Sequence, residues 1–147
     1  MFPDLPAVSA TVIVYVLTGL AAVVVVLTRV RLGRPQKAGR LEVGRSLLNL
    51  HTGAGGLALV VWVTFLVAPE SSTLGGSVVG LAAIGLWWVV ALAGLLILVR
   101  WLPSRGRHAA EERSDGWSQG PGLSVLAHVG MLVGVGVFTW AYLTQVV

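Results

Sequence analysis

Four long apolar runs, nearly free of charge, constrain this chain more than any other feature of its sequence. A bilayer hydrocarbon core of about 30 Å needs about 20 residues of helix to cross it, whereas barrel strands are shorter and alternate in polarity. The lengths of the runs therefore predict membrane-spanning helices rather than strands. Their expected bounds are about 8–30, 46–68, 76–102 and 123–147.

The composition supports a membrane protein. Of the 147 residues, 56% are hydrophobic and 11% are charged, compared with about 25% charged in a typical soluble domain. We expect an all-α membrane protein, a single domain over residues 1–147 that forms an up-down four-helix bundle. The absence of Cys excludes disulfides, thiolate metal ligands and thioether-linked haem.

The positions of the ten basic residues predict the orientation of the bundle. All of them lie in or beside the first and third connections. Because basic loops stay in the cytoplasm, we expect both termini outside, a multi-pass protein of the bacterial inner membrane, and contact with membrane lipid rather than nucleic acid. The basic residues are Arg29, Arg31, Arg34, Lys37, Arg40, Arg45, Arg100, Arg105, Arg107 and Arg113.

A shift of 77 positions suggests an internal repeat. It aligns Leu48–Gly53 (LNLHTG) with Val125–Gly130 (VLAHVG), so that both segments carry His-x-Gly near the start of an expected helix. Two such hairpins would be related by a pseudo-two-fold axis along the membrane normal. The pattern indicates a tandem duplication of a two-helix hairpin, although few other positions match.

Two of the three histidines occupy matched depths. His51 and His128 each lie five residues inside an expected helix that starts in the cytoplasm, which places them about 8 Å from the helix ends. Ionisable residues within a span usually face the protein interior and mark a cofactor, ion or substrate site. His108 lies in the third connection, and we assign it no role.

Two neutral imidazoles at one depth on different helices suit the axial positions of one haem b. We expect His51 and His128 to bind its iron, with Gly55 among the small residues on the His51 face against which the flat ring lies. Arg45, at the cytoplasmic end of the same helix, is the expected partner of a haem propionate. Positive-inside topology alone also places arginines at that surface.

The four spans and the contexts L-H-x-G at His51 and A-H-x-G at His128 resemble small four-helix membrane b-type cytochromes. Examples are the succinate dehydrogenase anchors and the membrane domains of ferric reductases. The resemblance implies electron transport in a respiratory chain, with a quinone or redox protein as partner and a larger membrane complex as setting. The sequence departs from relatives that carry two stacked haems, because it has one histidine pair and no histidine in its outer half.

Other interpretations remain open at this stage. Either histidine alone could form an interhelical hydrogen bond, and small-xxx-small pairs such as Gly76/Gly80 and Gly130/Gly134 predict close helix packing without a cofactor. The main alternative function is therefore a haem-free accessory or assembly subunit of a larger membrane complex. A transporter is less favoured because the spans lack a polar pathway, and the residues of a hydrolase or ATPase site are missing.

Overall fold

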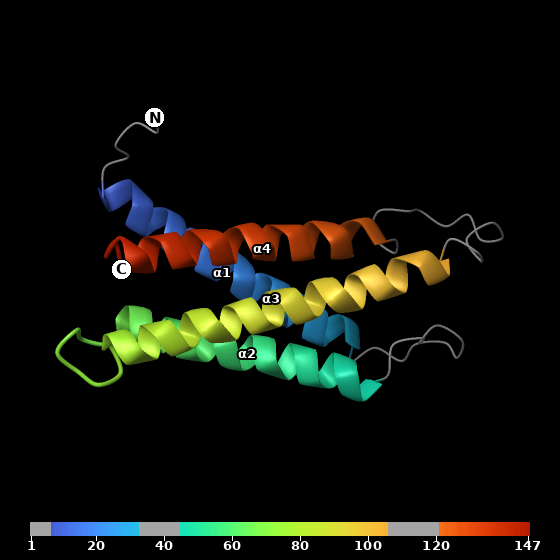
Figure 1. The fold of residues 1–147 in the computed structure, drawn as a ribbon, viewed down its shortest axis with the longest axis horizontal. Helices are drawn as coiled ribbons and strands as arrows, with labels where there is room; N and C mark the ends of the chain where they lie inside the picture. Colours follow the sequence, from blue (N-terminus) through green and yellow to red (C-terminus); the bar gives the residue numbers. More distant parts are fainter. Residues whose placement is uncertain (1–6, 33–44, 106–120) are drawn as a thin grey trace.

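The computed structural model describes residues 7–32, 45–105 and 121–147, with side chains for 9–30, 46–99 and 125–147. These residues form four α-helices (Figure 1). All four are long and apolar enough to cross a membrane, which confirms the expected fold class of a four-helix membrane bundle. The helices are α1 (Ala7–Leu32), α2 (Arg45–Val67), α3 (Ser77–Arg105) and α4 (Pro121–Leu143).

Local hydrogen bonds end the helices where apolar sequence gives way to Gly, Pro and Ser. In the turn between α2 and α3, the Ser72 backbone N–H donates to the Pro69 carbonyl, and the Gly75 N–H donates to the Ser72 hydroxyl. At the end of α4, Gln145 has a positive φ of 56°, and the Val146 N–H donates back to the Ala141 carbonyl. This left-handed cap stops α4 four residues before the expected bound.

The helices alternate in direction, and α1 crosses the other three at an angle (Figure 1). Near its start α1 lies beside α4, where the Thr11 hydroxyl donates to the Val146 carbonyl. Near its end it lies beside α2, where the Arg29 guanidinium approaches Gly53. Each of α1 and α3 packs against both α2 and α4, so α2 and α4 lie diagonally across the bundle.

The two ends of the bundle differ in charge. The five arginines of the helices, Arg29, Arg31, Arg45, Arg100 and Arg105, lie where α1 and α3 end and α2 begins. We call this the basic end. The opposite end, here the turn end, carries the start of α1, the turn between α2 and α3, and the C-terminus (Figure 1). Glu70 in that turn is the one acidic residue of the described chain.

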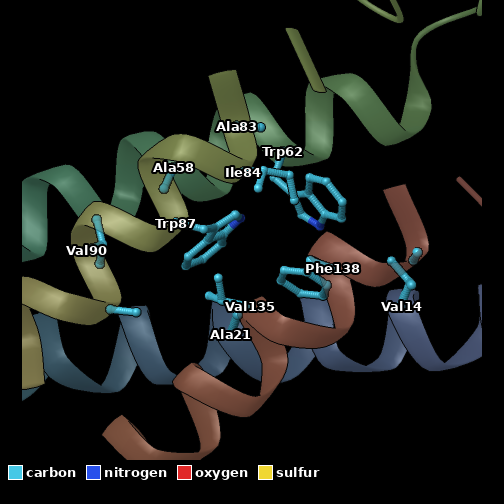
Figure 2. Close-up of a cluster of buried hydrophobic side chains, with 12 residues drawn as sticks. Val14, Ala21, Ala58, Trp62, Ala83, Ile84, Trp87, Val90, Val135 and Phe138 are labelled. Carbon is cyan, nitrogen blue, oxygen red and sulfur yellow. The ribbon is translucent and has the colours of Figure 1, made fainter. Parts of the chain in front are cut away.

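Residues spaced seven apart on α2, α3 and α4 arrange the core in three layers about 10 Å apart. From the basic end, these are the histidine layer (His51, Gly94, His128), the middle layer (Ala58, Trp87, Val135) and the aromatic layer (Phe65, Gly80, Tyr142). The middle layer is fully buried, and Figure 2 shows the Trp87 indole lying between Val135 and Phe138 of α4 and Trp62 of α2. The aromatic and histidine layers place rings opposite a glycine of α3, so α3 approaches α2 and α4 closely there.

Candidate functional site

The structure brings the two intramembrane histidines together from diagonal helices. The ring centroids of His51 and His128 are 6.1 Å apart, and the ring planes differ by 14°. Both residues are partly buried. The seven-residue spacing explains the encounter, because His51 shares the inward face of α2 with fully buried Ala58, and His128 shares that of α4 with fully buried Val135.

Gly94 of α3 forms the third wall of this layer. A Cβ built on Gly94 would lie 2.8 Å from Cε1 of His51, 2.8 Å from Cδ2 of His128 and 3.0 Å from Nε2 of His128. The two imidazole edges thus converge on one point, and they are closer to each other than the ring centroids are. Only a glycine fits beside both rings, because any side chain would push at least one of them away.

The ring separation suits the coordination of one metal ion from opposite sides. With metal–nitrogen bonds of about 2 Å, two imidazoles on opposite sides of a metal have ring centroids roughly 6 Å apart. The 6.1 Å between the His51 and His128 centroids is close to that separation, and the ring atoms nearest Gly94 are Cε1 of His51 and Cδ2 and Nε2 of His128. No group of three or more His, Cys, Asp or Glu side chains gathers within the described residues. Two axial imidazoles suffice when a porphyrin supplies the equatorial nitrogens.

His51 has unused hydrogen-bonding capacity. Its Nδ1 atom is buried, and no residue in the described part of the chain hydrogen-bonds to it. The hydroxyl of neighbouring Thr52 donates to the Leu48 carbonyl of the same helix instead. A buried polar atom without a partner costs about 1–3 kcal/mol, and Nε1 of Trp87 in the middle layer is in the same situation.

The other residues expected at the site have mixed outcomes. Gly55 is buried on the His51 side of α2, and a Cβ there would lie 3.7 Å from Cγ1 of Val90, so it packs against α3. Its contact with a haem ring stays a prediction. Arg45 begins α2, but its side chain lies outside the described part, and His108 lies outside the described residues altogether.

Sequence reasoning did not identify two residues near the site. One is Gly94. Its seven-residue spacing from Trp87, and that of Trp87 from Gly80, places all three residues on one face of α3 and could have indicated it. The other is Arg29, whose Nη2 atom lies 3.7 Å from the position of a Cβ on Gly53, two residues beyond His51. Arg29 is the one charged residue within the four apolar spans, which was the available signal.

The aromatic layer provides an internal comparison. A Cβ on Gly80 would lie 2.5 Å from Cε2 of Tyr142 and 2.8 Å from Cε2 of Phe65, so two rings again meet over a glycine. Their centroids are 5.9 Å apart, but the planes differ by 64°, and the Tyr142 hydroxyl donates to the Ser77 carbonyl. The same backbone architecture therefore places two imidazole rings over a glycine at one level and two packed aromatic rings over a glycine at the other.

No family model, curated protein or solved structure matches the chain.

Proposed function

We propose that this protein is a membrane-bound b-type cytochrome that binds one haem between His51 and His128. The observation that carries the proposal is the convergence of these two rings, 6.1 Å apart and 14° from parallel, over Gly94. A bound haem would supply one-electron chemistry. The chain's own residues supply two axial nitrogens and an apolar surrounding.

A haem bound by both histidines would have no axial position left for a substrate, which favours electron transfer over oxygen activation. The connections between the helices are short compared with the 50 or more residues of a flavin or nicotinamide domain. Electrons therefore pass between this site and a quinone, a redox protein or a respiratory complex. Positive-inside topology places the basic end in the cytoplasm of a bacterium and both termini outside.

The aromatic layer favours the alternative, a haem-free accessory or assembly subunit. Phe65 and Tyr142 show that two rings pack over a glycine in this bundle without binding a metal. The difference lies in the chemistry of the rings, since imidazole nitrogen binds metals and the buried Nδ1 of His51 has no partner among the described residues.

Visible spectroscopy of the protein purified from haem-replete cells separates the two functions. We expect a reducible Soret and α-band pair at one haem per chain, lost in His51→Ala and in His128→Ala. His108→Ala is the matched control, because it removes a histidine from the third connection and should leave the spectrum unchanged. A colourless, monodisperse wild-type protein would favour the haem-free subunit.

A further inference from the structure

Toward the turn end, the histidine layer is covered by buried side chains. Between it and the turn end lie Ala58, Trp62, Trp87 and Val135, each with 0% of its surface exposed, and Phe138 with 1% (Figure 2). The histidines themselves keep part of their surface exposed. They lie about 9–11 Å from the helix starts at the basic end, while His51 is about 24 Å from the end of α2 at the turn end. The basic end is therefore the nearer aqueous surface to this layer.

That end also concentrates positive charge. All five arginines of the helices belong to it, and the one acidic residue of the described chain, Glu70, is at the other end. Arg29 is exposed and its guanidinium lies against α2 near Gly53, two residues from His51. A mouth lined by charge of one sign raises the local concentration of oppositely charged partners and speeds their association.

We propose that the electron-transfer partner reaches the histidine layer through the basic end and presents an acidic surface to it. This inference rests on the proposed function, because it names the kind of redox protein that the site fits. It predicts two properties of the layer: access from the basic end alone, and a preference for anions over cations.

Access can be measured without haem, because the chain contains no Cys. In His51→Cys and Ala54→Cys, the introduced thiolate attacks a methanethiosulfonate reagent, forms a mixed disulfide and releases methanesulfinate. The anionic sulfonatoethyl reagent should react roughly tenfold faster than the cationic trimethylammonioethyl reagent at low salt, with the ratio falling toward one at high salt. Ala58→Cys, one layer deeper, is the matched control and should not react.

Two charge-removing substitutions, one at each end of the bundle, test how much Arg29 contributes to the preference for the anionic reagent. Arg29→Gln should slow the anionic reagent and speed the cationic one by roughly twofold each. Glu70→Gln changes the net charge by one unit at the opposite end and should leave both rates unchanged. In sealed vesicles, both reagents should label His51→Cys only when added to the side on which the basic end is exposed.

The haem-loaded protein provides a second readout. Reoxidation of the dithionite-reduced protein should be faster with ferricyanide than with hexaammineruthenium(III), each of which accepts one electron, and added salt should narrow the difference. Equal, salt-independent rates for anion and cation, or labelling from the turn end, would overturn the inference and leave the haem proposal standing. An anion preference that disappears in vesicles containing phosphatidylglycerol would also overturn the inference, because anionic lipid headgroups would then pair with the arginines. A colourless protein that shows the labelling preference would refute the haem and retain the basic entrance.

Discussion

At the scale of single residues, Gly94 decides whether two imidazoles can meet. It is buried on α3 and contacts rings from both α2 and α4. Alanine is the smallest change that tests this role, because its one extra carbon would lie 2.8 Å from each ring. Contacts this short force the rings apart, and the imidazoles could then not bind one metal together.

Gly94→Ala should therefore lower the haem content of the purified protein at least about tenfold, which corresponds to about 1.4 kcal/mol of lost binding. Gly85→Ala on the same helix is the control, because a Cβ there meets nothing within 4 Å. The haem-to-protein ratio measures both variants. Full occupancy in Gly94→Ala would show that the glycine is not a wall of the haem site.

Gly80→Ala tests the aromatic layer in the same way. The new Cβ would lie 2.5 Å from the Tyr142 ring, which is tethered by its hydrogen bond to Ser77. Overpacking of this kind costs about 1–3 kcal/mol, so the thermal midpoint in detergent should fall by several degrees. Haem content per folded chain should not change, and a second substitution, Tyr142→Ala, should relieve the clash. A midpoint equal to that of the wild type would contradict the close approach at this layer.

At the scale of elements, apolar length predicted the four helices to within a few residues at each end. The depth of His51 and His128 in their helices predicted that they share a level, and the structure places their rings side by side. Glycine pairs were less informative. Gly80 does mark a close approach, whereas a Cβ at Gly130 or Gly134 meets nothing within 4 Å, so neither marks a close approach among the described residues.

The reason is that a glycine pair does not specify which face of the helix is turned inward. On α3 the inward face follows a seven-residue repeat from Gly80 through Trp87 to Gly94, which depends on the packing of α2 and α4 as well. The duplication signal has the same limit. The 77-residue shift aligns Gly94 with Leu17 of α1, so the third wall of the histidine layer is not repeated. The duplication itself stays a prediction.

The equivalence of the two ring layers leads to a gain-of-function prediction. If ring–glycine–ring geometry is sufficient for haem binding, Phe65→His combined with Tyr142→His should create a second site about 20 Å from the first. The expected result is two haems per chain, measured by pyridine haemochrome against protein mass. Each single substitution serves as a control and should leave the count at one. A folded double variant that retains one haem would show that further features of the histidine layer are required.

At the scale of the whole molecule, the bundle is a multi-pass membrane protein with the start of α1 and the C-terminus at the turn end (Figure 1). The arginines at the basic end predict that this end faces the cytoplasm. Alkaline phosphatase fused after Val147 should therefore be active in a bacterial host, and green fluorescent protein fused at the same residue should be dark. Bright fluorescence with inactive phosphatase would reverse the orientation and move the proposed entrance to the outer face.

The central claim is that His51 and His128 bind one haem together, and titration of haem into the haem-free protein tests it most directly. The Soret absorbance should rise to a sharp break at one equivalent and have the low-spin, six-coordinate form. His51→Ala and His128→Ala should each lose tight binding or give a five-coordinate, high-spin spectrum. A titration without saturation, or one that is unchanged when either histidine is removed, would contradict the account.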